Sequence, residues 1–484
     1  MIKLMLPSAL TLILAFITCS VNAAAPPNVI IFIADDVSWD DFGCYGSKNA
    51  KTPNIDRIVN DGIQFNNFYL TASSCSPSRN SIMTGRYPHN TGAAELHTQP
   101  PESMLSLPEL LRKEGYHTVL AGKHHLGKYA ARGFDEEYRK KTINGDGGEE
   151  RWEQTIEERP TDKPFFFWFA THDSHRGWGE NKFSGTHDPE ELIVPPYLAD
   201  SIETRKDLAA YYDEVHRFDH YIGKGVAKLK SEGIYENTIL IIMADNGRPF
   251  PHSKTRVNDR GMKSPFIVIW PKGISRPGSE CNALVSAIDI APTLLKLAGA
   301  ETPDQFQGIP FDQLFADPSK AARSYLFAEH NWHDFEAHER MLRSEHFMYI
   351  LNSRPQLANH GAGDVLGSPS SADLFRLDDA DELNDLQRDL FIAPRPAHEL
   401  YDLRVDKAQH NNVASIPEYQ DELAEMQSVL QQWMSVTGDS VPKNLTRDWR
   451  SRTVPRRNTE YRDIRGEMPG AINNATEINA KGPF

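Results

Sequence analysis

Continuous apolar runs, separated by segments with helical periodicity, recur through the first three hundred residues of the chain. The runs span residues 28–34, 117–121, 164–170, 238–244 and 265–270. Such runs are typical of strands that are buried on both faces of a parallel sheet. The chain therefore begins, after a short leader, with the strands of a large buried sheet.

Helices are predicted between these runs from capping residues and from the spacing of apolar positions. Thr52 and Pro53 suit the start of one helix, and Gly299 closes another that begins at Asp289. The longest predicted helix spans residues 204–230 and is amphipathic. Strands that alternate with helices in this way predict a doubly wound α/β domain.

The pattern weakens after about residue 335, which we take as a domain boundary. Residues 343–352 and 399–403 predict strands of a smaller sheet, and residues 419–436 predict a helix. The segment 353–396 predicts loops with short helices, and the polar tail from Pro442 predicts irregular chain. We therefore expect a main α/β domain over 24–335 and a smaller C-terminal subdomain over 336–484.

The N-terminus has the pattern of a secretory signal peptide over residues 1–23. Lys3 precedes an apolar run at 10–17, and small residues at 21–25 follow it. The alternative, a retained membrane anchor, is disfavoured because the run is short. We expect an exported protein that does not act at a membrane, periplasmic or secreted, or lysosomal in a eukaryote.

The composition of the chain limits which classes of molecule it is expected to bind. The chain has a net charge of −15, 39% hydrophobic and 25% charged residues, as in a soluble globular enzyme. This charge argues against nucleic acid as a partner, so an anionic substrate would need a local basic pocket. Beyond the leader, Cys44, Cys75 and Cys281 remain, too few for a disulfide scaffold. A Cys44–Cys281 bridge and two buried thiols both stay open.

Polar clusters follow four of the predicted strands. They are Asp35-Asp36, residues 122–127, residues 171–175 and residues 245–247. Ligands of open α/β sheets gather at the carboxyl ends of strands. Two adjacent carboxylates there suit a hard divalent cation such as calcium, whereas a lone Asp could simply cap the next segment.

The stretch from Cys75 to Arg79 predicts a turn that enters a short helix. Pro77 suits the first helical turn, and Cys75 would lie at the helix N-terminus, where free N–H groups favour anionic oxygen. Arg79 lies on the same face and could reach the same anion. These are the parts of a catalytic anion site, although the short motif alone would also fit a structural cysteine beside an exposed arginine.

The longer motif, Cys-x-Pro-Ser-Arg followed by Thr-Gly-Arg at 84–86, resembles the signature of type I sulfatases, in the alkaline phosphatase superfamily. The resemblance extends to residues 28–36, 52–56, 115–118, 122–127, 245–247, 286–293 and 399–403. It implies a large mixed, mostly parallel sheet sandwiched by helices, with a C-terminal α+β subdomain that carries an antiparallel sheet. One departure is His124, where the family usually has Trp.

The resemblance also implies the cofactors. In the family, the cysteine that matches Cys75 is oxidised to formylglycine by a formylglycine-generating enzyme, and its hydrate is the nucleophile. Arg79 would stabilise that hydrate. One calcium ion would polarise the sulfate and hold the nucleophile, with ligands from residue 75 and from Asp35, Asp36, Asp245 and Asn246.

The remaining catalytic positions are carried over in the same way. Lys123 would contact the sulfate, and His125 resembles the base that removes the second hydroxyl's proton. Lys254 matches a sulfate-contacting residue near the leaving oxygen. His175 matches the general acid, with His172 as a second candidate.

Two further segments contain side chains whose role the sequence leaves open. A basic loop could contact anionic parts of a substrate or could be an ordinary solvated loop. The segment 330–334 has residue types common in sugar sites and could line the substrate pocket. The basic residues of the loop are Arg248, His252, Arg256 and Arg260.

The sequence motifs at residues 172–176, 245–251 and 399–402 resemble those of the sulfamidase-like branch of the family. The resemblance implies a sulfuric ester hydrolase that removes O-sulfate or N-sulfate from sulfated sugars or polysaccharides. Two alternatives remain, a phosphonate or phosphodiester hydrolase of the same superfamily and a non-catalytic protein that binds sulfated glycans. An oligomer is equally compatible with the sequence.

Overall fold

The computed structural model describes residues 25–450 and 464–483, and the signal peptide predicted at 1–23 lies outside them. The main feature is an eight-stranded sheet in the order β5-β4-β6-β1-β7-β8-β2-β9. Its strands are β1 Asn28–Ala34, β2 Gly62–Phe65, β4 His117–Gly122, β5 Glu136–Tyr138, β6 Phe165–Ala170, β7 Thr238–Ala244, β8 Phe266–Ile269 and β9 Ser279–Cys281.

The centre of the sheet is parallel. Ile31 of β1 pairs with Trp168 of β6 on one side and with Ile241 of β7 on the other. Strand β8 runs antiparallel to both of its neighbours, and the other pairs in this sheet are parallel. The predicted mixed, mostly parallel sheet is therefore confirmed.

The helices that accompany this sheet follow the predicted pattern. The long helix predicted at 204–230 is α7, whose N-cap Ser201 accepts a hydrogen bond from the Thr204 N–H. The full set is α1 Pro53–Ile58, α2 Cys75–Thr84, α3 Pro88–Thr91, α4 Leu107–Lys113, α5 Lys141–Asn144, α6 Trp152–Glu158, α7 Ile202–Ser231, α8 Asp259–Met262, α9 Ile290–Leu297 and α10 Gln313–Ala316.

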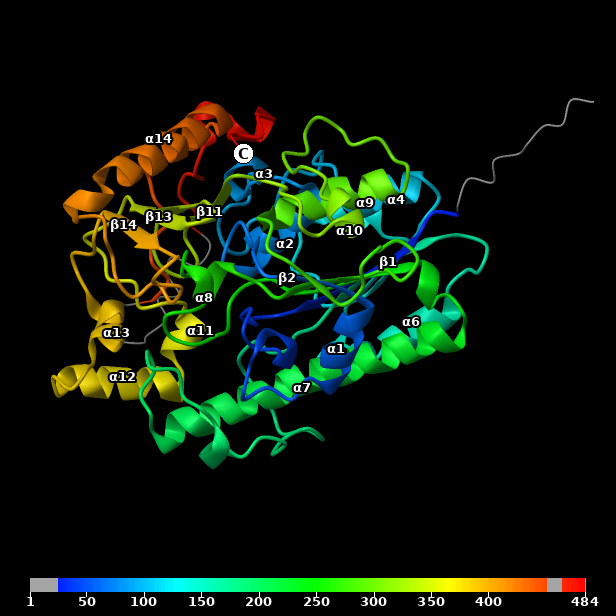
Figure 1. Ribbon diagram of the computed structural model, residues 1–484, viewed down its shortest axis with the longest axis horizontal. Helices are drawn as coiled ribbons and strands as arrows, with labels where there is room; N and C mark the ends of the chain where they lie inside the picture. Colours follow the sequence, from blue (N-terminus) through cyan, green and yellow to red (C-terminus); the bar gives the residue numbers. More distant parts are fainter. Residues whose placement is uncertain (1–24, 451–463, 484) are drawn as a thin grey trace, which may run out of the picture.

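Helices cover both faces of the sheet, as Figure 1 shows. Alternate residues of a strand point to opposite faces, so β1 contributes to two cores. Ile30 and Phe32 pack with α1, α6 and α7 on one face. Ile31 and Ile33 pack with α2, α4 and α9 on the other. This sandwich fixes where the carboxyl ends of the central strands lie.

The C-terminal part contains a four-stranded antiparallel sheet in the order β11-β12-β13-β14. Its first strand precedes the boundary predicted after residue 335, so the sheet begins within the segment assigned to the main domain. The strands are β11 Leu326–His330, β12 Glu339–Arg343, β13 Phe347–Asn352 and β14 His398–Asp402. The helices are α11 Gly363–Leu366, α12 Pro369–Asp379, α13 Asp385–Arg388 and α14 Gln420–Thr437.

The strand predicted at 343–352 is confirmed over residues 347–352 as β13, but it begins later than predicted because a hairpin turn precedes it. Arg343 ends β12, and β13 begins at Phe347. The Ser344 N–H donates to the Phe347 carbonyl at 2.9 Å, and the Phe347 N–H donates to Ser344 Oγ at 3.2 Å. Side-chain bonding by Ser closes the turn, a local effect that the apolar pattern did not reveal.

The second arginine of the Cys75 motif is structural. Arg86 is 1% exposed and lies after α2. Its guanidinium donates to the carbonyl oxygens of Thr476 at 3.0 Å and Ile478 at 2.9 Å, and to Asn479 Oδ1 at 2.7 Å. The C-terminal tail is therefore held against the helix that carries Cys75. The described residues of the tail near 476–479 thus pack against the rest of the chain.

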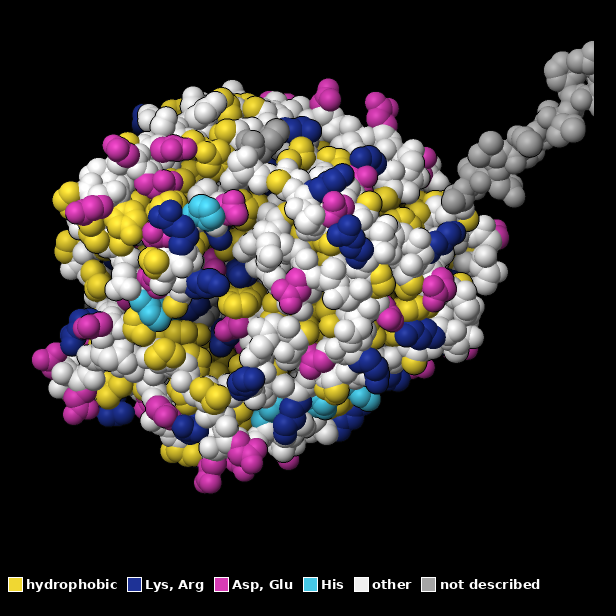
Figure 2. Space-filling view, in the orientation of Figure 1, with side chains coloured by type: hydrophobic (Ala, Val, Ile, Leu, Met, Phe, Trp, Pro, Cys, Tyr) yellow, Lys and Arg dark blue, Asp and Glu magenta, His cyan; other side chains and the backbone are white. Residues whose placement is uncertain are grey.

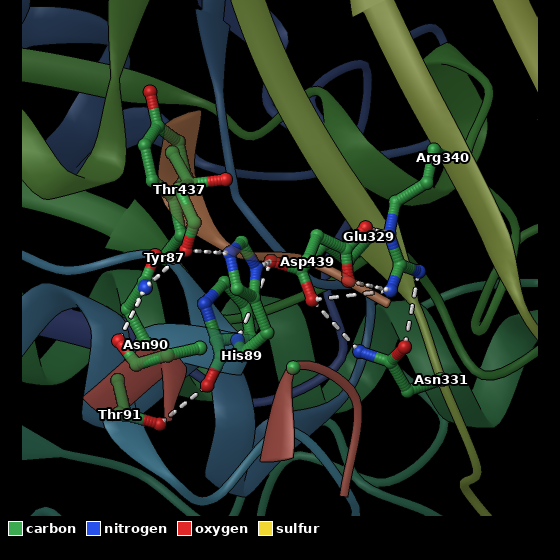
Figure 3. A network of polar contacts seen from close by, with 12 residues as sticks. Tyr87, His89, Asn90, Thr91, Glu329, Asn331, Arg340, Thr437 and Asp439 are labelled. Atoms are coloured by element: carbon green, nitrogen blue, oxygen red, sulfur yellow. Dashed lines mark hydrogen bonds and ion pairs between the residues drawn. The ribbon is translucent and has the colours of Figure 1, made fainter. Parts of the chain in front are cut away.

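A buried polar network joins α3, the antiparallel sheet and the end of α14 (Figure 3). Glu329 accepts from His89 Nδ1 at 2.6 Å and from Asn331 Nδ2 at 2.9 Å. Arg340 binds Asp439 through Nε at 2.6 Å and Nη2 at 2.8 Å. Arg340 also donates from Nη1 to Asn331 Oδ1 at 3.0 Å. Charges this deeply buried are tolerated because each has partners.

Other sequence-based alternatives are resolved by the structure. Cys44 and Cys281 are free thiols, so the bridge between them is absent. Among residues 25–450 and 464–483, no helix has both the length and the apolar character needed to cross a bilayer.

Arg340→Ala is expected to lower the free energy of unfolding by about 3–5 kcal/mol, because it leaves Asp439 buried without its cation. Chemical denaturation followed by tryptophan fluorescence measures the change. The matched control is Lys206→Ala, which removes the exposed Lys206–Glu203 pair and should cost less than about 1 kcal/mol. Equal losses in the two variants would contradict the importance of this network.

Candidate active site

Three parallel strands bring their carboxyl ends to one edge of the sheet, where the predicted polar residues gather. Asp35 and Asp36 follow β1, Asp245 and Asn246 follow β7, and Lys123 follows β4. The four acidic and amide residues are 0% exposed. The Asp36 N–H donates to Asp245 Oδ1 at 3.1 Å, which joins the two adjacent strand ends directly.

Helix α2 begins at Cys75 and directs its N-terminus at these residues, as the motif predicted. Cys75 is 2% exposed, and its Sγ lies 3.8 Å from Asp36 Oδ1. The N-cap Ser74 makes no side-chain bond to the helix. Its Oγ bonds His333 Nδ1 at 2.8 Å instead. The first-turn N–H groups and the helix dipole therefore favour negative charge near Cys75.

The oxygen atoms at the strand ends fit a divalent cation. Ligand atoms of Asp35, Asp36 and Cys75 lie within 4.8 Å of one another. Asp35 Oδ1 and Asn246 Oδ1 are buried without a hydrogen-bond partner among the described residues. Hard oxygen donors with unused lone pairs are the ligands that calcium prefers.

Three buried cations neutralise these carboxylates. Arg79 Nε donates to Asp245 Oδ2 at 2.7 Å. Lys123 Nζ pairs with Asp35, and Lys254 Nζ donates to Asp36 Oδ2 at 2.7 Å. Because the acidic and basic side chains balance, an added divalent cation would leave the site positive and attractive to an anion.

Arg79 retains unused donors. It is 0% exposed, so the alternative of an exposed arginine beside a structural cysteine is excluded. Its Nη1 and Nη2 have no hydrogen-bond partner among the described residues, although Nη2 lies 3.8 Å from Asp35 Oδ1, within ion-pair distance. Unpaired buried guanidinium N–H groups are costly, and an oxyanion would satisfy them.

The thiol of Cys75 is a poor nucleophile in this setting. Burial raises the pKa of Cys75 well above its usual value, although Lys123 and Lys254 oppose the shift. The thiolate is the reactive form of cysteine. Near neutral pH, residue 75 is therefore present as the thiol rather than the thiolate.

His125 lies beside the cations in an uncommon backbone conformation, with φ of 42°. Its Nε2 is 2.9 Å from His97 Nδ1, and its Nδ1 is buried without a partner among the described residues. Burial, with Lys123 and His97 nearby, lowers the pKa of His125 well below its usual value. The imidazole is therefore neutral near neutral pH, and Nδ1 is the ring nitrogen that is left without a partner in the described part of the chain.

His175 occupies the loop after β6. Its Nδ1 donates to the Arg176 carbonyl at 3.0 Å, and its Nε2 lies 3.5 Å from Asp364 Oδ2. Asp364 also accepts from Lys254 Nζ at 2.8 Å, which places His175 beside the cation group. His172 lies in the same loop, and burial lowers its pKa to about 4.

The loop that carries these histidines is fixed by Asp173. Its carboxylate pairs with Arg217 of α7, and its carbonyl accepts from the Asp35 N–H at 2.6 Å. A polar pocket of about 430 Å³ opens here, lined by residues that include Asp35, Lys123 and His175. Of the predicted site residues, four line this open pocket: Asp35, Lys123, His172 and His175.

The basic loop after β7 is not an ordinary solvated loop, because Arg248, His252 and Arg256 are buried. Arg248 is 3% exposed and pairs with Asp40 and Asp41. Arg256 pairs with Asp389 at 2.9 Å, which anchors the segment around α13. Arg256 and Arg260 line a pocket of about 60 Å³ together with residues of α13. Figure 2 shows that the surface is hollowed in the region of α8 and α11. These ion pairs bind the two parts of the chain together.

Part of the segment 330–334 lies in the candidate site, and part of it is packed in the core. His333 reaches Ser74 beside Cys75, and with Asp334 and Asp364 it forms a cluster within 4.8 Å. Trp332 is 3% exposed and packs on Trp449, with ring centroids 4.7 Å apart. The indole therefore offers no face to a sugar.

Sequence reasoning missed Asp364 and His97. Asp364 lies in a segment with no motif, and His97 lies in a turn before α4. Each reaches a predicted site residue through contacts that only the folded chain reveals. His124, the departure from the family pattern, has a buried Nε2 without a partner among the described residues, and burial lowers its pKa to about 4.

Comparison with protein families gives two matches. A sulfatase family model matches residues 27–300, which contain Asp35, Cys75, Lys123 and Asp245. A model of the C-terminal region of N-sulphoglucosamine sulphohydrolase matches residues 252–352.

Curated relatives cover most of the chain. An ulvan-active sulfatase of Formosa agariphila is 27% identical over 470 residues, 85% of this chain and 75% of that protein. Human N-sulphoglucosamine sulphohydrolase is 27% identical over 479 residues, 90% of this chain and 94% of that protein.

Solved structures share the fold. A protein in complex with its substrate D-glucosamine-2-N,6-O-disulfate superposes with a TM-score of 0.68 at 20% identity, covering 85% of this chain and 98% of that one. A 2-O GAG sulfatase superposes with a TM-score of 0.63 at 21% identity, covering 85% and 92%. These neighbours confirm the predicted fold class.

In protein that keeps residue 75 as a thiol, alkylation of Cys75 by iodoacetamide near neutral pH is expected to be at least about tenfold slower than that of an exposed cysteine. The reason is that each unit of raised pKa lowers the thiolate fraction tenfold. Quantitative mass spectrometry of the tryptic peptide measures the rate, and unfolding in guanidinium should restore it. Rapid alkylation of the folded protein would contradict the burial described above.

Proposed function

Because this chain belongs to the sulfatase family and is a sulfuric ester hydrolase, we propose that it removes sulfate from sulfated sugars. The observation that carries the proposal is the cluster at the N-terminus of α2. There Arg79, Lys123 and Lys254 surround Cys75 and a set of buried oxygen donors. This arrangement suits a small tetrahedral oxyanion.

Cys75 would serve as the precursor of formylglycine, made by a formylglycine-generating enzyme. The hydrated aldehyde would supply a hydroxyl nucleophile, which the buried thiol cannot replace at neutral pH. Residue 75 lies at a helix N-terminus 3.8 Å from Asp36, a position that favours developing negative charge.

The cations would bind and orient the sulfate group. Arg79 Nη1 and Nη2 have donors to spare, and a sulfate or hydroxyl oxygen would satisfy them. Lys123 pairs with Asp35 and Lys254 pairs with Asp36, so the two ammonium groups would contact different oxygens of the sulfate. Three fixed donors would hold the sulfur in line for attack.

Two histidines would transfer protons during the reaction, each through one ring nitrogen. His175 Nδ1–H donates to the Arg176 carbonyl, so the proton that would go to the leaving oxygen or nitrogen would be the second one, carried by Nε2 of the imidazolium. Asp364, 3.5 Å away, would attract a proton-bearing Nε2. His125 Nδ1 is the free acceptor that would take a proton from the hydroxyl of residue 75.

Calcium is the proposed metal, held by Asp35, Asp36, Asp245 and Asn246. When bound, it would polarise a sulfate oxygen and orient the residue-75 hydroxyl. The unpartnered buried oxygens of Asp35 and Asn246 support this assignment, because a hard cation would satisfy both.

The sugar class follows from the relatives. The C-terminal model and the human relative both carry the name N-sulphoglucosamine sulphohydrolase, and the Formosa relative acts on ulvan. The open pocket is polar, with Lys141, Asp146 and Asn181 in its wall, as hydroxyl-rich substrates require. Export by the N-terminal leader would bring the enzyme to extracytoplasmic polysaccharides. O-sulfated and N-sulfated sugars both fit the proton-donating role of His175.

Cys75→Ala is expected to lower sulfate release from N-sulfated or O-sulfated glucosamine by at least about 10⁴-fold, since covalent catalysis is lost. Ion chromatography of released sulfate, from enzyme made in a host with the maturation system, measures turnover. Circular dichroism should show an unchanged fold.

Two results would count against the proposal. One is wild-type turnover by purified Cys75→Ala protein, which would remove residue 75 from the chemistry. The other is a matured wild-type enzyme that cleaves phosphodiesters in parallel assays but releases no sulfate from any sulfated sugar.

Calcium is expected to raise the Tm of the wild-type protein, since a ligand at one hundred times its Kd stabilises by about 2.7 kcal/mol. Asn246→Ala should reduce the calcium-dependent shift by removing one ligand, whereas Glu203→Gln at an exposed site should leave it intact. Differential scanning fluorimetry with calcium and with chelator makes the comparison. A Tm that does not respond to calcium in the chelated wild type would contradict the metal assignment.

A further inference from the structure

His97 contacts the proposed base without belonging to any motif. Its Nδ1 lies 2.9 Å from His125 Nε2, and the two ring centroids are 5.0 Å apart. Both residues have positive φ, 63° for His97 and 42° for His125. Non-glycine residues adopt this conformation at some energetic cost, and they concentrate at functional sites.

Contacts of both the backbone and the ring hold His97 in place. Its backbone N–H donates to Ser76 Oγ at 2.8 Å, beside Cys75 in α2. Its ring stacks on Trp449, with centroids 6.0 Å apart and an interplanar angle of 20°. The preceding Leu96 N–H donates to the Trp332 carbonyl at 3.2 Å. Fixed contacts of this kind hold Nδ1 in one place relative to His125.

The contact between the two imidazoles determines where the protons lie. A neutral imidazole has one N–H donor and one acceptor nitrogen, and the partner of one nitrogen fixes the other. His125 Nδ1 is buried without a partner among the described residues, whereas its Nε2 faces His97 Nδ1. If His125 Nε2 carries the hydrogen and donates it to His97 Nδ1, the free Nδ1 is the acceptor.

We infer that His97 is a positioning residue that holds His125 in the Nε2–H tautomer and so keeps His125 Nδ1 available as a base. The role of His125 as the base rests on the proposed function, but the tautomer does not. When Nδ1 takes a proton, the Nε2–H bond to His97 remains in place and stabilises the resulting imidazolium. No other group must move for the proton transfer.

The direct test is nitrogen-15 NMR of selectively histidine-labelled protein that keeps Cys75 as a thiol. The signals of His125 are identified as those that disappear in His125→Gln. We expect a protonated Nε2 and an unprotonated Nδ1 in the wild type. His97→Phe preserves an aromatic ring beside Trp449 but deletes the acceptor, and it should abolish this single tautomer.

His97→Asn supplies the matched rescue, because its amide oxygen can accept near the position of Nδ1 and Asn tolerates positive φ. His346→Phe is the control for the same substitution at an exposed histidine. Thermal unfolding checks that each variant folds. Restoration of the Nε2–H tautomer by His97→Asn, and no change in His346→Phe, would support the inference.

Kinetics of the matured enzyme give a second measurement. His97→Phe should lower kcat by about tenfold or more with little change in KM, since general-base catalysis contributes at least that much. In a His125→Ala background, the same change should have no further effect.

The outcomes separate the two proposals. An Nδ1–H tautomer of His125 in the wild type, or a tautomer that persists in His97→Phe, overturns the inference whatever the substrate. A matured wild type that releases no sulfate while the NMR result holds would count against the proposed function and leave the positioning role intact.

Discussion

The structure depends on the balance of charge at the carboxyl ends of β1 and β7. Asp35, Asp36 and Asp245 are buried together, which is tolerable only because Arg79, Lys123 and Lys254 pair with them. These cations come from α2, from the end of β4 and from the loop after β7. The sheet, its flanking helices and the following loops must therefore all be in place before the site is electrostatically stable, so folding and site formation are coupled.

Much of this arrangement could be predicted from sequence, since it depends on local patterns. Apolar runs identify central strands, and the polar residues that follow them must meet at one edge of a parallel sheet. The helix that begins at Cys75 followed from Pro77 and from its position. The hairpin at Ser344 and strand β11 were not predicted, because a Ser side chain closes the turn locally and these short strands show only a weak alternation in the sequence.

The site residues that were not predicted from sequence were missed for one physical reason. Asp364 and His97 lie in irregular segments, and each acquires its role from one contact with a distant residue, Lys254 or His125. Arg86 shows the converse, because a residue of the most specific motif turned out to hold the C-terminal tail against α2. A motif marks residues that are needed together, whereas the fold decides which of them face the substrate and which hold the segments in place.

The central claim is that catalysis uses an aldehyde made from Cys75. Mass spectrometry of the peptide that carries residue 75, from a preparation with measured sulfate release, tests it most directly. The account predicts loss of the sulfur and gain of one oxygen at this residue, in a fraction of molecules that rises with specific activity across preparations. A fully active preparation in which residue 75 remains an unmodified thiol would contradict it.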